Sequence, residues 1–285
     1  TYQSEQRELE VVVASTPQSV FQYALFGSES LDISGNAISD SYDSSQGAYN
    51  PASPGQNGDI GTNATTAGAV TVSGTIAVNG QVAVGAGGDP STVVDTSGGS
   101  YLITGNPPMA AQSTNLGIPA VSIPAGLDCS ASLSVGGSQT NTLPASTPAS
   151  CNASNECCFA SVGVSGGGTL TASGPVTVYV TGPFSGTGNT VIGVPSDPTQ
   201  FLMILTSSQP ATLEGDLTGS TEFYGGLYTP TGTISITGSA EVFGSVIAEQ
   251  VDISGNAKVH YDEAMTSVGP TGSSVVDIQQ WREVK

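Results

Sequence analysis

The acidic residues that lie close together in this sequence are the first candidates for chemistry. Asp40 with Asp43, and Asp262 with Glu263, are the closest pairs for acid–base cleavage of a glycosidic bond, which needs two convergent carboxylates. Neighbouring residues of a strand point to opposite faces, so Asp262 and Glu263 would not converge if a strand continues there. Asp40 and Asp43 could instead bind calcium, although no EF-hand loop or Gly-Gly-x-Gly-x-Asp repeat is present.

Basic groups, which many enzyme mechanisms require, are scarce. No lysine or arginine occurs between Arg7 and Lys258, and His260 is the single histidine of the chain. A uronate lyase needs a basic group to take a proton and to neutralise the substrate carboxylate, and most of the chain has none. A lone histidine beside a lysine in a strand is more often a packed or surface group. No nucleophile elbow, Walker loop or paired metal-ligand motif is present, so we expect no enzymatic activity.

The charge balance excludes two classes of partner. The 285 residues include 23 acidic and four basic ones, which gives a net charge of −19. Nucleic-acid binding requires clustered cations, and an anionic membrane surface would repel this chain. The longest dense apolar stretch is 201–205, far below the roughly 18 residues of a membrane span. The first residues carry charges where a signal peptide is apolar, so secretion would require a leader or anchor removed before Thr1.

Four cysteines lie within one thirty-residue stretch, at Cys129, Cys151, Cys157 and Cys158. An even, clustered number favours two disulfides formed in an oxidising compartment. Zinc is disfavoured, because the cysteines lack C-x-x-C spacing and the histidine is a hundred residues away. A bond between the adjacent Cys157 and Cys158 would need a strained ring, so each is expected to pair with Cys129 or Cys151, in either arrangement.

Short internal repeats indicate which elements position these residues. An apolar residue followed by Ser/Thr-Gly recurs at intervals of 17 to 19 residues in the last third of the chain. Within the copies apolar residues alternate, which predicts strands with one buried face. The copies are LTGSTEFYG from Leu217, ITGSAEVFG from Ile236, ISGNAKVHY from Ile253, ISGNAISDS from Ile33, VSGTIAVNG from Val72 and ASGPVTVYV from Ala172.

A unit this short can bury its apolar face only when copies stack. We therefore expect an all-β fold, a parallel β-helix or β-solenoid with coils of about 17–20 residues. The near-identical segments 31–44 and 251–264 are interpreted as one structural motif used repeatedly, with Leu217, Ile236 and Ile253 at the same core position of successive coils. Residues that permit tight corners are expected at Gly35, Asn36, Gly74, Gly174, Gly219, Gly238, Gly255 and Asn256.

Residues 1–26 are expected to form an extension to the solenoid domain of residues 27–285. Thr16 is a suitable N-cap and Pro17 a suitable first helical residue, so 16–26 is predicted to be a short helix capping the solenoid. Residues 107–162 are predicted to be a loop insertion held by the disulfides. The apolar segment before the helix could pair with another subunit as an added strand. The expected assembly contacts are Leu9, Val11, Val13, Val20 and Phe21.

Several segments, in their order along the chain, resemble bacterial PilX-like proteins associated with type IV pili. They are ALFGSESLDISGNAISDSYDSSQGAY, NGDIGTN, GPVTVYVTG, FYGGLYTP, VFGSVIAEQVDISGNAKVHYDEA and the closing WREVK. The resemblance runs from about Ala24 to the C-terminus, apart from the stretch around the cysteines. It implies a β-helical ectodomain at the bacterial surface with a structural or adhesive role. Members of that family carry an N-terminal membrane helix, which is absent from this sequence.

These observations favour a structural subunit or ectodomain of an extracellular, pilus-like surface fibre. Its expected partners are further copies of itself or other fibre components. The alternatives are a monomeric surface adhesin that binds glycans or surfaces and, with less support, a polysaccharide-active β-helix enzyme. No cofactor is expected apart from calcium at the acidic loops, and the expected location is extracellular or on the bacterial cell surface.

Overall fold

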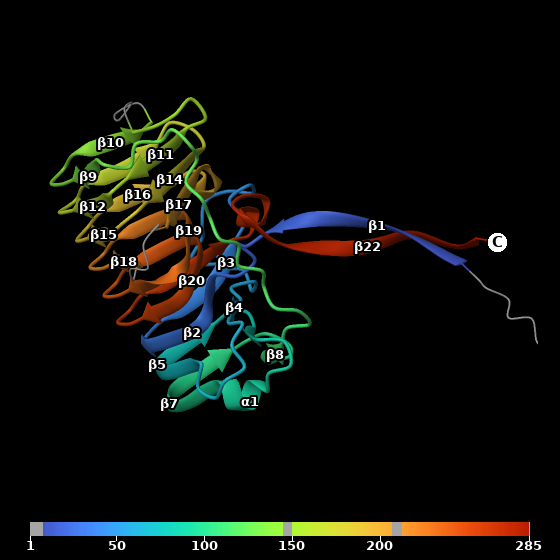
Figure 1. Cartoon of the computed structure of the whole chain (residues 1–285). Helices are drawn as coiled ribbons and strands as arrows, with labels where there is room; N and C mark the ends of the chain where they lie inside the picture. Colours follow the sequence, from blue (N-terminus) through green and yellow to red (C-terminus); the bar gives the residue numbers. More distant parts are fainter. Residues whose placement is uncertain (1–7, 145–149, 207–212, 285) are drawn as a thin grey trace, which may run out of the picture.

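The computed structural model describes residues 8–144, 150–206 and 213–284, and in this part of the chain the fold is almost entirely β (Figure 1). Helical structure is confined to α1 (Pro90–Val93) and the 3-10 turns η1 (Pro198–Gln200) and η2 (Glu263–Ser267). Among the described residues, no helix has the length and apolar character required to cross a membrane.

The strands of the body pair in parallel and form three columns. The first column runs in the order β9 (Ser132–Val135), β12 (Ser161–Ser165), β15 (Phe184–Thr187), β18 (Leu213–Leu217), the ends of β19 (Glu222–Ile236) and β20 (Glu241–Ile253), β2 (Leu25–Gly35), β5 (Val70–Val78) and β7 (Val94–Ile103).

The second column contains the outer face on which the candidate site lies. It runs in the order β10 (Thr140–Leu143), β13 (Thr169–Ala172), β16 (Val191–Gly193), the beginnings of β19 and β20, β21 (Lys258–Asp262), β3 (Ile38–Tyr42) and the ends of β5 and β7.

The third column runs in the order β11 (Glu156–Phe159), β14 (Val176–Val180), β17 (Phe201–Leu205), the middle of β19 and β20, the start of β2, β4 (Ile60–Gly61), β6 (Val82–Val84) and β8 (Met109–Ala111). Long strands such as β19 turn a corner and belong to more than one column. The hydrogen-bonded sheet therefore closes on itself like a parallel barrel with additional strands.

The chain enters this body in the middle, because β2 lies between β20 and β5. It winds to one end at β7 and β8, crosses along the body to the other end, and returns to β21, which pairs with β3 (Figure 1). The crossing segment is attached on its way: Asn63 Nδ2 donates to the carbonyl of Leu116, and the Tyr228 hydroxyl donates to that of Pro119. The first and last thirds of the sequence therefore meet at one seam.

The seam explains the two near-identical segments of the sequence. Leu31, Asp32 and Ile33 pair with Val251, Asp252 and Ile253 in neighbouring strands. The two near-identical segments therefore form two successive layers of the stack that turn at the same place.

The core register agrees with the repeat alignment. Leu217 pairs with Ile236, Ile236 with Ile253, and Ile253 with Ile33. All four side chains are at most 3% exposed and lie in one hydrophobic core. The alternation of apolar residues therefore selects the buried face.

Glycines stack at the corner between the first and second columns. Gly35 has a φ of +82°, and a Cβ there would lie 2.3 Å from the carbonyl oxygen of Gly255. A Cβ at Gly255 would likewise lie 2.5 Å from the carbonyl oxygen of Gly238. Only glycine combines this backbone angle with so close an approach. Beside the glycines, Asn36 Nδ2 donates to Asn256 Oδ1 at 3.0 Å. Gly74, Gly219 and Gly238 also have positive φ and belong to the same stack of corner glycines.

Gly174 does not lie at this corner. It follows β13, in the turn toward β14, where a Cβ would meet nothing within 4 Å. In that layer the corner is formed by Gly166, with a φ of +59°. The Ser-Gly motif occurs at two kinds of turn in this fold. The segment from Ala172 is therefore not equivalent in position to the other copies of the repeat, and its alignment with them is wrong.

The predicted cap helix at 16–26 is wrong. Residues up to Ser19 belong to β1 (Glu8–Ser19), which pairs antiparallel with β22 (Thr271–Val284). The two strands form a separate ribbon that stands away from the body (Figure 1). A partner strand from the other end of the chain satisfies the β1 backbone, and this tertiary pairing overrides the local helix signals.

The two predicted disulfides are confirmed, as Cys129–Cys158 and Cys151–Cys157. They join the end of the crossing segment and the loop before β11 to β11 itself, which contains both Cys157 and Cys158. The expected loop insertion 107–162 contains β8 to β11 and the start of β12, and its residues Leu133, Leu143 and Phe159 are buried. The strands of this region are therefore part of the stack, and the crossing segment joins β8 to β9.

The register yields a stability test. Ile236→Asp would place a lone carboxylate at a fully buried position, and we expect a loss of several kcal/mol in unfolding free energy. Ser239→Asp, at an exposed turn three residues later, should change stability little. Denaturant unfolding measures both, and an Ile236→Asp protein as stable as the parent would contradict the register.

Candidate functional site

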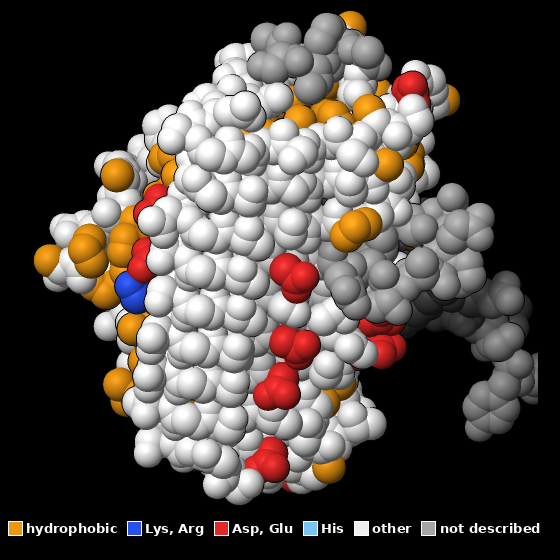
Figure 2. Space-filling view, turned by 90° about the vertical axis from the view of Figure 1, so that its left-hand side faces the viewer, with side chains coloured by type: hydrophobic (Ala, Val, Ile, Leu, Met, Phe, Trp, Pro, Cys, Tyr) orange, Lys and Arg blue, Asp and Glu red, His pale blue; other side chains and the backbone are white. Residues whose placement is uncertain are grey.

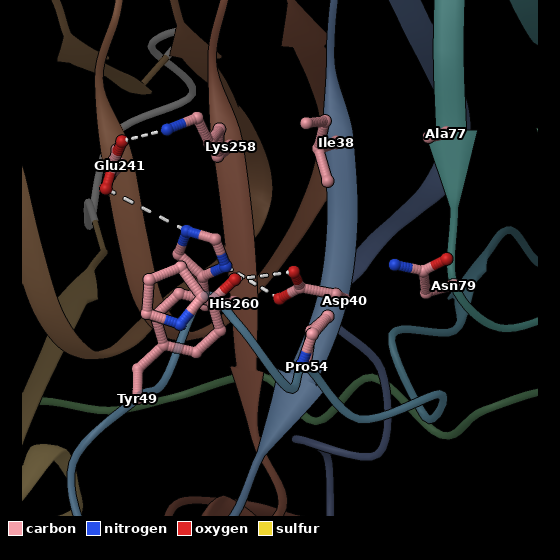
Figure 3. A pocket seen from close by; sticks show the side chains of 10 residues that line it. Ile38, Asp40, Tyr49, Pro54, Ala77, Asn79, Glu241, Lys258 and His260 are labelled. Carbon is pink, nitrogen blue, oxygen red and sulfur yellow. Dashed lines mark hydrogen bonds and ion pairs between the residues drawn. The ribbon is translucent and has the colours of Figure 1, made fainter.

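A cleft of about 500 Å³ lies on the outer face of the second column, where β20, β21, β3 and β5 are neighbours (Figure 3). The segment between β3 and β4 covers part of it. The cleft is lined by Ile38, Asp40, Tyr49, Pro51, Pro54, Ala77, Asn79, Glu241, Lys258 and His260.

Strand register brings these side chains together from distant parts of the sequence. Glu241 pairs with Lys258, and Lys258 with Ile38, in one row across the strands. His260 pairs with Asp40 in the next row. Alternate residues of a strand share a face, so both rows point outward from the sheet.

His260 and Asp40 are buried although they lie on the outer face. Their side chains are 3% and 4% exposed, and His260 Nδ1 lies 2.6 Å from Asp40 Oδ1. His260 Nε2 faces Glu241 Oε2 at 3.8 Å. The Tyr49 hydroxyl donates to Asp40 Oδ2 at 2.7 Å, while the Tyr49 ring lies over the imidazole with centroids 3.9 Å apart (Figure 3). Tyr49 therefore joins the covering segment to the histidine pair.

The surroundings of His260 favour its charged form. Burial lowers its pKa, but the hydrogen bond to Asp40, the polar contact with Glu241 at 3.8 Å and the negative charges of both carboxylates raise the pKa overall. The polar contact with His260 and the hydrogen bond from Lys258 lower the pKa of Glu241 to about 2. Lys258 Nζ lies 2.5 Å from Glu241 Oε1. The site therefore brings together two basic groups, Lys258 and His260, and two acidic groups, Glu241 and Asp40.

An aromatic row extends the site along the body. The ring of Tyr224 stacks on that of Phe243, with centroids 4.5 Å apart and an angle of 7°. Phe243 in turn lies 4.9 Å from the His260 ring. Tyr224, Phe243 and His260 occupy paired positions in β19, β20 and β21. Polar and aromatic contacts thus hold the outer face together at the seam.

The carboxylates that the sequence singled out have separate roles. Asp262 is buried, and its Oδ1 accepts hydrogen bonds from the backbone of Ser44 and Ala264, while burial raises its pKa. Glu263 accepts a hydrogen bond from the Ser41 hydroxyl at 2.9 Å. Asp262 and Glu263 therefore fix the chain on either side of the site and do not share a substrate position.

Acidic residues outside the site do not form a metal centre in the described part of the chain. Asp43 accepts hydrogen bonds from the backbone and hydroxyl of Ser45, away from the Asp40–His260 pair. Asp32 and Asp252 are paired neighbours in the first column, whose face carries a row of acidic side chains among uncharged ones (Figure 2). Among the described residues, no group of three or more His, Cys, Asp or Glu side chains is placed to hold a metal ion. Calcium binding remains a prediction without a defined site.

The expected assembly contacts have partners within the chain. Val20 and Phe21 are completely buried, and the Phe21 ring packs edge-on against Tyr228. The register of the ribbon places Val11 opposite Trp281 and Val13 opposite Ile278, and Leu9 pairs with Glu283. Val20 and Phe21 are therefore not available to another subunit in this arrangement.

The Asp40–His260 pair was not foreseen from the sequence, although a signal for it was present. Aligning segment 31–44 with segment 251–264 sets Asp40 directly opposite His260. The sequence does not show that these two segments stack on each other, because residues 220 positions apart in sequence need not be neighbours in the fold.

Comparisons with known proteins give one partial match. Residues 160–268 match the model of a family described as a domain of unknown function (DUF7305). No curated protein and no solved structure matches the chain. The matched segment contains Glu241, Lys258 and His260, whereas Asp40 and Tyr49 lie outside it. The cleft is therefore completed by a part of the chain that this family model does not include.

The raised pKa of His260 predicts a pH dependence of stability. A group whose pKa is higher in the folded state stabilises the fold below its unfolded pKa of about 6.5, and this contribution disappears as pH rises through the folded pKa. We expect the unfolding free energy to fall as the pH rises from about 6.5 through the folded-state pKa of His260, and His260→Gln to remove most of that fall. Asp216→Asn, which removes a charge elsewhere, should retain it. An unchanged pH profile in His260→Gln would refute a charged histidine.

Proposed function

We propose that this chain is a structural subunit or ectodomain of an extracellular, pilus-like surface fibre, and that its body is a parallel β-solenoid. The observation that carries the proposal is the ribbon of β1 and β22, through which both ends of the described chain leave the body together (Figure 1). Attachment through the ribbon would hold the body from one side and leave both ends of the stack accessible.

The solenoid interpretation is supported by the three columns of parallel strands and by the corner glycines. In a solenoid each layer contacts only its neighbours, so the same residue type is required at the same place in every layer. Leu217, Ile236 and Ile253 meet this requirement in the core, and Gly35 and Gly255 meet it at the corner. The columns correspond to the three sides of such a coil.

An extracellular, structural role is supported by chemistry as well as shape. Two disulfides are typical of an oxidising compartment. His260 has a carboxylate near each ring nitrogen and Tyr49 over its face, so it serves to join layers in this arrangement. The resemblance to PilX-like proteins supports a bacterial surface fibre. We therefore propose that the partners of this chain are further copies of itself or other components of such a fibre.

The ribbon provides the test of this proposal. Val11→Pro should weaken the pairing of β1 with β22, because proline fixes φ near −65°, away from the antiparallel β value of about −140°, and removes a backbone N–H, while the body keeps its core. We expect immunogold labelling along surface fibres for the parent and for the conservative control Val11→Thr, and release of folded Val11→Pro protein into the medium. Parent protein found only as free, unattached chains would contradict the fibre proposal.

A monomeric adhesin is the second candidate, and the cleft favours it. Lys258 and Glu241 offer a donor and an acceptor at one end, Asn79 offers an amide, and Ile38 and Ala77 form an apolar floor. These groups suit a neutral sugar, which presents hydroxyls and an apolar face. An anionic sugar would meet a chain of net charge −19.

A glycan screen tests the adhesin. If the cleft binds a sugar, neutral oligosaccharides should bind the purified chain, and Asn79→Ala should weaken binding about tenfold, the effect of losing roughly 1.4 kcal/mol. Ser134→Ala, at an exposed position of β9, is the matched control and should have no effect. Binding that Asn79→Ala leaves unchanged would place the sugar elsewhere, and no binding at all would remove the adhesin candidate.

A further inference from the structure

The two ends of the stacked body differ in how their core is covered. At the end formed by β9 and β10, the inward side chains of Leu133, Val135 and Leu143 are 6%, 1% and 0% exposed. At the opposite end, formed by β7 and β8 and called here the base, Tyr101 and Leu102 are 49% and 61% exposed. They are the exposed large hydrophobic residues among those described.

The register shows why Tyr101 is exposed. It pairs with Ile76, a core residue that is 3% exposed, so Tyr101 occupies a core-facing position in the last layer. Leu102 pairs with Ala77 on the outer face. Within the described pairings, β7 bonds only to β5 and β8 only to β6, so each has one free edge. The base therefore combines an uncovered part of the core with open strand edges.

A groove of about 550 Å³ lies beside this patch. Its apolar lining comes from Pro90, Tyr101, Leu102, Ile103, Pro108 and Met109. Asp89 also borders the groove, where its carboxylate caps α1 through the backbone and hydroxyl of Ser91. These contacts lower the pKa of Asp89, so the rim of the groove is negatively charged at neutral pH.

We propose that the base binds the base of a second copy of this chain, with β7 of each copy edge to edge about a two-fold axis. The fold already contains a non-covalent contact between strand edges at the seam, where β3 and β21 pair in parallel although more than two hundred residues separate them. The two β7 strands of the proposed pair would run antiparallel. A second copy supplies what the base lacks, a strand edge and apolar side chains, without requiring a positive charge.

The same observations favour a two-fold pair over head-to-tail stacking. Tyr101 and Leu102 lie at the end of the second column, whose opposite end is β10, where Thr140 is exposed and Leu143 is completely buried. Stacking the base on that end would set Tyr101 and Leu102 against a polar edge, whereas two bases bury both patches together. A two-fold contact closes after two copies and is the commonest symmetry of soluble homo-oligomers.

Charge sets the conditions for this contact. Two copies of net charge −19 repel each other, and the charged groups nearest the groove include Asp89. Salt screens such repulsion, with a Debye length near 10 Å at about 0.1 M, so the dimer should be tighter at higher salt. The inference is independent of the fibre proposal, because the bases can pair whether or not the ribbons are attached to a fibre.

Sedimentation equilibrium of the full purified chain, over a range of concentrations at low and high salt, tests the inference. We expect a monomer–dimer equilibrium that salt shifts toward the dimer. Leu102→Glu adds a charge at an exposed position and should weaken the dimer at least tenfold. Ser134→Glu, the same change at the opposite end, should leave it unaltered. Amide exchange of β7 in the parent protein should slow as concentration rises, which tests the surface without a variant.

Three results would overturn the proposal. The first is a strict monomer at every concentration and salt. The second is a dimer that Leu102→Glu does not weaken and whose formation does not slow the amide exchange of β7. The third is mass that grows beyond a dimer and is lost in Ser134→Glu, which would indicate head-to-tail stacking. Fibre labelling in cells is a separate measurement, so failure here and failure of the fibre proposal are distinguishable.

Discussion

Close approach of backbones at one corner is the constraint on which this structure depends. At Gly35 a Cβ would collide with the backbone of Gly255, and at Gly255 with that of Gly238, so each of these corners can stack only if it lacks a Cβ itself. This requirement fixes where the layers from Gly219 to Gly99 turn and therefore which residues face one another along each column. The paired core positions, the amide contact of Asn36 with Asn256 and the outer polar rows all follow from that fixed phase.

The seam shows a consequence of corners that lie at a fixed position in the layers. Chain continuity is not needed between neighbouring layers, because β2 and β3 stack on β20 and β21 from the far end of the sequence. The aromatic and charged contacts around His260 lie over this junction, where no covalent connection holds the layers. Burying an ionised pair stabilises only when its partners are in place, so the cluster favours correct joining of the two halves over displaced register.

The sequence allows the all-β class, the core register and the presence of two disulfides to be predicted, because each depends on local periodicity or on cysteine number. It does not allow the order of layers to be predicted, because equivalent repeats can stack in several orders. The helix expected at Thr16 shows the same limit. Its capping residues are suitable, but β22 provides hydrogen-bond partners from more than 250 residues away, and local propensity is too weak to compete. The disulfide arrangement likewise required the path of the crossing segment.

The candidate site is a consequence of layer order and could not arise from either half alone. Asp40 and Tyr49 come from the first part of the chain, while Glu241, Lys258 and His260 come from the last. An additional layer between β21 and β3 would separate the histidine from Asp40 by the spacing of one further strand, about 4.8 Å, and break their hydrogen bond. The charged pair is therefore specific to direct contact of these two layers. Sequence change at this junction is constrained jointly in two segments that only the fold brings together.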